Sequence, residues 1–375
     1  MIPPGEWSRL AVRALAGATV VLSALGPGGA TPAVAEPAFA VRTGYSCAQC
    51  HINRTGGGMR TAFGSIYTQT TLPRRLLKWR EGGNLLPANP DARFSVGGNL
   101  RGQYVAVESR DFEDVFSFEI PEASLYAEAR LVPGRLSVYL DEKVGPGGAS
   151  ARELFGLFSL KKWNGYVKVG KFLPPYGWRL PDDAAFIRQF SGFTYVNPDI
   201  GVEFGVAPGR WSAHLAVVNG AAGGSDDNRS KKFTLQAVRR FRKGRVGVSG
   251  SNNIRGGMTT TQAGILGGAN FGRLALLAEG DWVESTRSDG TDHRLLGFIE
   301  ADVLVTRGVN LKLAHDWMDP DLDTRTDART RDSVGVEIIP FPFVQLRWFV
   351  RWKDGPPQIA GARDKQVDLE VHIFF

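Results

Sequence analysis

The C-terminal stretch of the chain reads Val-Asp-Leu-Glu-Val-His-Ile-Phe-Phe, residues 367–375, and alternates strictly between apolar and polar side chains from Val367 to Ile373. Because successive side chains of a β-strand point to opposite faces, Leu369 and Val371 lie on one face and Asp368 and Glu370 lie on the other. One face suits lipid and the other suits water. The stretch is therefore typical of a strand that separates the two.

The same alternation recurs from about Ala92 to Phe375, in short segments separated by Gly, Asn, Asp and Pro. A soluble β-sandwich would also alternate, but its core would rarely contain facing walls of Arg and Glu. We therefore predict an all-β fold, a 16-stranded antiparallel transmembrane β-barrel of the porin-like, outer-membrane kind. The sixteen segments begin near Phe94, Phe116, Arg135, Arg152, Tyr166, Asp199, Arg210, Lys231, Gly244, Thr260, Gly272, His293, Gly308, Arg331, Phe343 and Asp364.

Tight connections alternate with longer ones, as periplasmic turns and outer loops do in such barrels. The net charge of +7 conceals a division between these two sets. The predicted inner turns hold Arg135, Lys161, Lys162, Arg210, Arg242, Lys243, Arg273 and Arg307. The predicted outer loops hold Asp111, Glu113, Asp114, Asp182, Asp183, Asp226, Asp227, Asp289, Asp292, Asp319, Asp321, Asp323 and Asp327. An acidic mouth would concentrate cations; the alternative is that these charges only solvate loops and contact the outer leaflet.

A sixteen-stranded barrel encloses an aqueous lumen, with room for a solute, a plug or another protein. Alternation places two sets of charges on the lumen side. They are Glu279, Asp281, Glu300 and Asp302 on two neighbouring strands, and Arg347, Arg351 and Lys353 on another.

A second motif precedes the barrel: Cys47-Ala48-Gln49-Cys50-His51, which contains the only two cysteines of the chain. This spacing is that of c-type haem attachment, in which Cys47 and Cys50 form thioethers and His51 is the proximal iron ligand. The alternatives are an ordinary disulfide and a Cys/His metal site. We predict one covalent haem c.

The position of the motif supports this prediction, because it follows a secretory leader. Arg9 and Arg13 precede an apolar stretch, residues 14–25, and a small-residue cleavage site follows at Ala33-Val34-Ala35. We therefore divide the chain into a signal peptide (1–35), a monohaem cytochrome c-like domain (36–90) and the barrel (91–375). The haem domain is expected in the periplasm or in the barrel lumen.

The sixth ligand of the haem iron is less evident. Met59 is the best candidate, because a thioether is a common distal ligand in c-type cytochromes; the alternative is that Met59 only packs. His214 and His372 are weaker candidates, because a lone strand histidine is usually a polar wall residue. Residues 56–58, all glycine, would let the chain turn close to the ring, and Phe63, Ile66 and Tyr67 would cover it.

Several of these residues carry a resemblance to a known family. Phe39-Ala40, Thr43-Gly44, the haem motif and Phe63-Gly64, followed by a sixteen-stranded barrel, resemble the fused monohaem cytochrome-porins of the outer membrane. The resemblance implies that the haem takes electrons from Fe(II) outside the cell, as in members from iron-oxidising bacteria. Residues 53–59 differ from the proline-containing segment of those members. Residues 168–177 are similar to a strand-end motif of phosphate-selective porins.

These patterns leave three functional hypotheses. The first is an outer-membrane cytochrome-porin that passes electrons to a periplasmic c-type cytochrome. If Fe(II) is the donor, this protein is an iron-oxidising electron-transfer protein. The second is a solute-selective porin with a haem-bearing plug, and the third is a sheath for a separate multihaem cytochrome. Outer-membrane lipid and a homotrimer are expected partners. The sequence contains no nucleic-acid-binding pattern, nucleophile elbow, phosphate loop or paired-histidine metal helix.

Overall fold

The computed structural model describes residues 37–76, 93–145, 147–226 and 228–375. The predicted signal peptide, residues 1–35, lies outside the described residues, and so do residues 36 and 77–90 of the predicted haem domain and Asp227. Within the described ranges, no helix is both long and apolar enough to cross a membrane.

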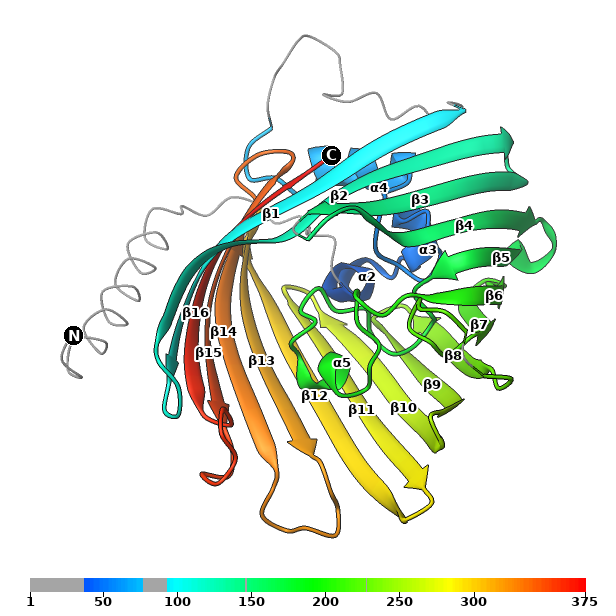
Figure 1. The fold of residues 1–375 in the computed structure, drawn as a ribbon. Coiled ribbons are helices and arrows are strands. Elements are labelled where there is room, and N and C mark those ends of the chain that lie inside the picture. The colour runs from blue at the N-terminus through cyan, green and yellow to red at the C-terminus, as the bar shows by residue number, and fades with distance from the viewer. Residues whose placement is uncertain (1–36, 77–92, 146, 227) are drawn as a thin grey trace. The chain divides into compact units, whose positions relative to one another are not determined.

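Sixteen antiparallel strands form one closed barrel, in which β1 pairs with both β2 and β16 (Figure 1). The predicted barrel is confirmed, and each predicted segment begins within three residues of the strand that forms. The strands are β1 (Phe94–Ser109), β2 (Val115–Val132), β3 (Leu136–Gly145), β4 (Ser150–Leu160), β5 (Gly165–Phe172), β6 (Asp199–Val206), β7 (Trp211–Val218), β8 (Lys232–Phe241), β9 (Gly244–Arg255), β10 (Met258–Phe271), β11 (Leu274–Arg287), β12 (Gly290–Thr306), β13 (Val309–Asp319), β14 (Arg329–Ile338), β15 (Val344–Asp354) and β16 (Asp364–Phe374).

The outer face of the barrel is apolar, as the alternation in β16 predicts. Leu369 and Val371 are 49% and 46% exposed, whereas Asp368 and His372 are each 6% exposed and point inward. Large apolar side chains are exposed in this way on strands all around the barrel. Such a belt of apolar side chains is the surface that a transmembrane barrel presents to lipid.

The last residue completes the barrel closure between β1 and β16. The backbone N–H of Gly98 donates to the carbonyl of Phe375 (3.2 Å), and the N–H of Phe375 donates to the carbonyl of Gly98 (3.1 Å). A Cβ on Gly98 would lie 2.5 Å from the ring of Phe375, and a Cβ on Gly97 would lie 2.9 Å from its carbonyl oxygen. The two adjacent glycines therefore leave the space that the C-terminus occupies.

The N-terminal segment forms three helices inside the barrel: α2 (Pro37–Thr43), α3 (Cys47–Cys50) and α4 (Ala62–Thr70). Arg42 donates to Oδ1 of Asn310 on β13 (2.8 Å), and Arg307, in the tight β12–β13 turn, donates to the carbonyl of Thr70 (2.6 Å). The segment thus occupies the lumen at the end where the short turns lie. Of the two expected locations, the periplasm and the barrel lumen, this segment lies in the lumen.

A second segment enters the lumen from the opposite end. The long β5–β6 connection, residues 173–198, carries the short helix α5 (Phe186–Gln189), which Figure 1 shows within the ring of strands. The backbone N–H of Phe186 donates to Oδ1 of Asp316 on β13 (3.0 Å). Asp182 and Asp183 therefore lie in a long connection, as predicted, but this connection turns inward and binds the barrel wall, so they do not form part of an acidic mouth.

Candidate functional site

The haem motif forms a single helical turn whose geometry follows from local hydrogen bonds. The backbone N–H of Ser46 donates to Oε1 of Gln49 (2.8 Å), which fixes the start of α3. The N–H of His51 donates to the carbonyl of Cys47 (2.9 Å). Both cysteines are free thiols and partly buried. Cys47, Cys50 and His51 all line one interior cavity.

Helix α4 packs directly against this turn. The N–H of Thr61 donates to the carbonyl of Cys50 (2.9 Å), and its hydroxyl donates to the carbonyl of Gln49 (2.7 Å). A Cβ at Gly64 would lie 2.3 Å from the carbonyl oxygen of Cys50. Only glycine allows the two helices to approach so closely, which gives a structural reason for the Phe63-Gly64 pair that the sequence analysis identified.

The cavity that the two thiols line, here called the motif cavity, contains about 1030 Å³ of space between atoms, part of it open to solvent. Its walls come from the N-terminal segment, from the β5–β6 connection and from the barrel. Tyr67 lines it as predicted, whereas Phe63 and Ile66 are 43% and 38% exposed and do not. Its other aromatic walls are Phe39, Tyr45, Trp178 and Tyr195.

The three glycines at 56–58 turn the chain back under the motif. Their φ angles are +100°, +83° and +63°, a region that side chains disfavour. A Cβ at Gly56 would lie 3.5 Å from Sγ of Cys47, within the space beside that thiol. The glycines thus form a close turn beside Cys47, and their predicted place next to a haem ring stays a prediction.

Burial changes the acid–base properties of the motif. It raises the pKa of the Cys50 thiol to about 11, and the neighbouring Cys47 acts in the same direction. It lowers the pKa of His51 to about 4, and the positive charge of Arg60 adds to this effect. The imidazole is neutral at pH 7, the form in which histidine binds a metal. Two thiols and a neutral imidazole on one largely apolar cavity fit a covalently attached haem.

Buried polar contacts hold the loop after the motif against the barrel wall. Nδ2 of Asn53 donates to Oε1 of Glu153 on β4 (2.7 Å), and its Oδ1 accepts from Nζ of Lys168 on β5 (3.0 Å). The N–H of Met59 donates to the hydroxyl of Tyr139 on β3 (2.9 Å). These bonds place the motif close to one wall of the lumen.

The structure does not bring the candidate sixth ligands to the motif cavity. Met59 is buried in an apolar cluster with Ile52 and Tyr139, and it does not line the motif cavity. Nδ1 of His214 is 2.8 Å from the hydroxyl of Tyr166, and Nδ1 of His372 is 2.6 Å from Oε1 of Gln345. The histidines face the lumen as predicted, whereas the assignment of Met59 as distal ligand stays a prediction.

The predicted acidic lumen residues point inward and are paired. Glu279 and Asp281 face Arg188 of α5, and the carboxylates of Glu300 and Asp302 lie 3.5 and 3.4 Å from Nζ of Lys312. The sequence analysis missed Arg188, because residues 173–198 have no periodicity that would place them in the lumen. Lys312 could have been found from the alternation of β13.

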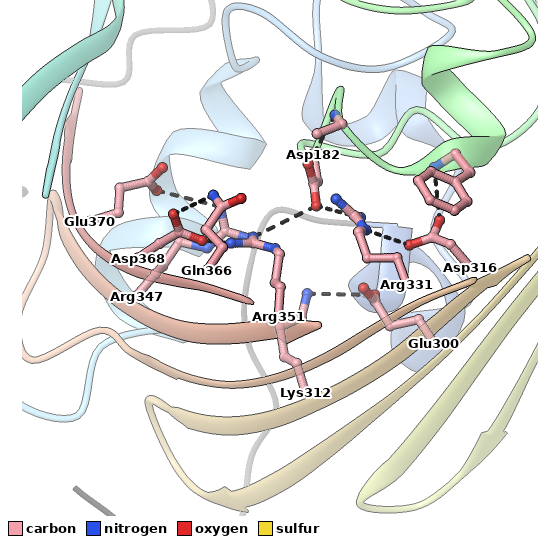
Figure 2. Close-up of polar contacts among 12 residues, drawn as sticks. Asp182, Glu300, Lys312, Asp316, Arg331, Arg347, Arg351, Gln366, Asp368 and Glu370 are labelled. Carbon is pink, nitrogen blue, oxygen red and sulfur yellow. Dashed lines mark hydrogen bonds and ion pairs between the residues drawn. The ribbon is translucent and has the colours of Figure 1, made fainter. Parts of the chain in front are cut away.

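Two of the predicted basic lumen residues, Arg347 and Arg351, belong to the network in Figure 2, whereas Lys353 pairs with Asp364 on β16 (2.8 Å). Asp182, from the inserted β5–β6 connection, accepts from Arg331 (2.8 Å) and lies 3.6 Å from Arg351. Burial alone would raise the pKa of Asp182, but these two arginines hold it well below its usual range. Arg347 and Arg351 also contact Glu370 and Asp368 on β16. The network attaches the inserted connection to β14 and β15.

A wide cavity lies between this network and the strands opposite, with about 1570 Å³ of space between atoms. Its lining is more basic than acidic, with eight Lys or Arg and five Asp or Glu residues. The basic residues are Arg101, Lys143, Arg152, Lys171, Arg331, Arg347, Arg351 and Lys353. This cavity therefore has an excess of basic side chains, whereas an acidic mouth formed by the outer loops stays a prediction.

Comparison with known proteins identifies the fold. No protein-family model and no curated protein matches the chain. Among solved structures, OmpT of Vibrio cholerae, an outer membrane protein in its trimer form, aligns with a TM-score of 0.60 at 12% identity, over 75% of this chain and 99% of its own. An anion-selective porin from Comamonas acidovorans gives the same four values. The outer membrane channel DcaP of Acinetobacter baumannii aligns with a TM-score of 0.57 at 10% identity, over 75% of this chain and 97% of its own. The chain has the fold of these sixteen-stranded, porin-like barrels.

Proposed function

We propose that this protein is an outer-membrane cytochrome-porin that carries one covalent haem c inside its barrel. Electrons pass between a donor or acceptor on the long-loop side, with Fe(II) the first donor to test, and a periplasmic c-type cytochrome on the short-turn side. The observation that carries the proposal is the position of Cys47, Cys50 and His51. They line one cavity inside the lumen of a barrel whose outer face suits lipid.

The residues of the chain have separate tasks in this proposal. Cys47 and Cys50 hold the haem by two thioethers, and His51 binds its iron. The haem, when bound, supplies the one-electron chemistry. The aromatic walls of the motif cavity exclude water, and the bonds from Asn53 and Met59 fix the motif to the barrel.

Access to the motif from both sides of the barrel supports a route for electrons. A cavity at the short-turn end is lined by Gln49, His51 and Arg54 together with the turn residues Arg135 and Asn164. On the other side, His51 also lines a cavity that continues toward the wide basic one. A partner at either end therefore approaches the same imidazole.

The basic interior also favours a second candidate, a solute porin that selects anions. The fold similarity to an anion-selective porin agrees with it. In this case purified protein in a planar bilayer would give a steady ohmic conductance with an anion-selective reversal potential, and removing Cys50 would not change either. A sheath around a separate multihaem cytochrome is less favoured, because the chain's own segments occupy the lumen.

The visible absorption spectrum of the full chain purified from outer membranes tests the proposal. A c-type spectrum that is reduced promptly by anaerobic Fe(II) is the expected result, with a Cys50→Ala variant as the control that assembles a barrel without this reaction. Haem bands that do not change when Fe(II) is added would exclude Fe(II) as the donor and keep the electron-transfer proposal with another donor. A barrel without haem bands would overturn the proposal.

A further inference from the structure

A second interior cavity adjoins the motif cavity and is rich in arginine. The two share Pro37, His51, Gly57, Arg60, Arg179 and Tyr195 as lining residues. The second cavity, here called the arginine cavity, holds about 930 Å³ of space between atoms. Four arginines line it, Arg60, Arg101, Arg152 and Arg179, against the two carboxyl groups of Glu122 and Asp183.

The carboxyl groups do not balance these charges. Arg152 pairs with Glu122 (2.7 Å) and with Asp141 behind it (2.8 Å), so Glu122 is already used. Asp183 accepts from the backbone N–H of Tyr195 (2.9 Å), and burial raises its pKa to about 6. The other three arginines therefore depend on other partners.

Those partners are distant or uncharged. Arg101 lies 3.9 Å from Glu370. Among the described residues, Arg179 donates only to the hydroxyl of Thr55 (3.2 Å) and to the carbonyls of Leu173 and Pro174 (3.2 and 3.4 Å).

Arg60 is the least compensated of the three. Within the described part of the chain its guanidinium forms no ion pair or hydrogen bond, and it lies over the ring of Phe374 at 4.3 Å from the ring centre. Arg60, Arg101 and Arg179 are half-buried and line the arginine cavity, so a charge there that lacks a carboxylate partner keeps only part of its hydration. A cluster of three arginines in this state is suited to an anion.

We propose that Arg60 and Arg179, supported by Arg101, bind carboxylate groups, and that these are the propionates of the haem. This inference rests on the proposed function. Arg60 and Arg179 line both cavities, so a haem attached at Cys47 and Cys50 would have both guanidinium groups in the wall of its cavity, available to its carboxylates. Guanidinium binds carboxylate with two parallel hydrogen bonds, which gives orientation as well as charge.

The midpoint potential of the haem, measured by spectroelectrochemistry on the full chain in detergent, tests this role. Arg60→Met should lower the potential, because loss of a nearby positive charge favours the oxidised iron, and Arg60→Lys should restore most of it. Arg273→Met is the matched control, since Arg273, in the β10–β11 turn, donates to the carbonyl of Val305 (3.4 Å) and lines neither cavity. Haem content per chain, measured for every variant, separates a change in potential from a failure to assemble. Equal potentials in wild type, Arg60→Met and Arg273→Met would overturn the assignment.

Addition of succinate at constant ionic strength, with chloride as reference, distinguishes the source of the carboxylate. If propionates occupy the site, succinate leaves the Soret band and the potential unchanged. If succinate instead shifts the Soret band or the potential in a saturable way, and Arg60→Met abolishes this shift, the propionate assignment is overturned and the site binds a free carboxylate. Should the purified barrel carry no haem, the proposed function fails by itself. In that case the carboxylate site predicts that succinate raises the melting temperature of the wild type and not that of Arg60→Met. If succinate raises neither, the carboxylate site is overturned as well.

Discussion

Lys168 and Glu203 form an ion pair on neighbouring strands of the lumen wall, with Nζ 3.0 Å from Oε2 and both side chains fully buried. The same ammonium group donates to Oδ1 of Asn53, two residues after His51. The pair is therefore also a point at which the barrel holds the haem motif. A buried pair is costly to form, and removing one partner leaves the other charge uncompensated.

Lys168→Met should destabilise the protein by about 3–5 kcal/mol, because Glu203 stays buried without its cation. Urea unfolding followed by tryptophan fluorescence measures the change. Lys168→Met combined with Glu203→Gln should recover a large part of the loss. Equal stability of the single and the double variant would show that the charge on Glu203 is not the cause.

Gly64→Ala should separate α4 from the haem motif, because the added Cβ would lie 2.3 Å from the carbonyl of Cys50. Overpacking of this kind typically costs about 1–3 kcal/mol. We expect a lower haem content per chain in a barrel that still resists unfolding by detergent. Gly102→Ala, where a Cβ would have no neighbour within 4 Å, is the control and should match wild type.

Asp182→Asn should destabilise the protein at pH 7, and this loss should shrink as the pH falls below about 4. Arg331 and Arg351 hold the folded-state pKa of Asp182 well below its unfolded value, in spite of burial, so its stabilisation is complete above about pH 4 and is lost progressively as the pH falls toward the folded-state pKa. Urea midpoints of wild type and variant, measured at intervals from about pH 7 to about pH 2, follow this difference. A difference that stays constant over the whole range would contradict the role of the charge. Asp226→Asn, on an exposed loop, should leave the midpoints unchanged.

Leu369→Arg should impair barrel stability by about 2–4 kcal/mol, because this exposed side chain lies on the lipid-facing side of β16. Refolding into vesicles followed by urea unfolding measures the loss. Leu369→Ala keeps the face apolar and should cost much less. Similar losses in the two variants would mean that packing, rather than lipid, determines the effect.

The strands could be predicted almost completely, because lipid outside and water inside impose a strict alternation on every one of them. Leu369 and Asp368 show this directly. Residues 173–198 could not be placed, since the Pro, Gly and aromatic residues of this connection have no period that distinguishes an inward loop from an outer one. Asp182 therefore seemed part of an acidic mouth, although its arginine partners lie more than a hundred residues later.

The Cys-Ala-Gln-Cys-His motif could be located from its own five residues, and the haem that it predicts stays a prediction. Its position in the lumen could not be predicted, because that position depends on contacts such as the one between Arg42 and Asn310, which are 268 residues apart. The surroundings of Arg60 were equally hidden, because a single sequence does not indicate which cation lacks a carboxylate partner. Long-range pairing, rather than local pattern, determines this part of the site.

Closure of the barrel also has a consequence for its assembly. The ring of Phe374 lies under the guanidinium of Arg60, and Phe375 pairs with Gly98 to join the last strand to the first. Because Phe374 belongs to β16, its contact with Arg60 can form only once that strand is in place. Enclosing the segment that carries Arg60 and closing the ring of strands are therefore a single event.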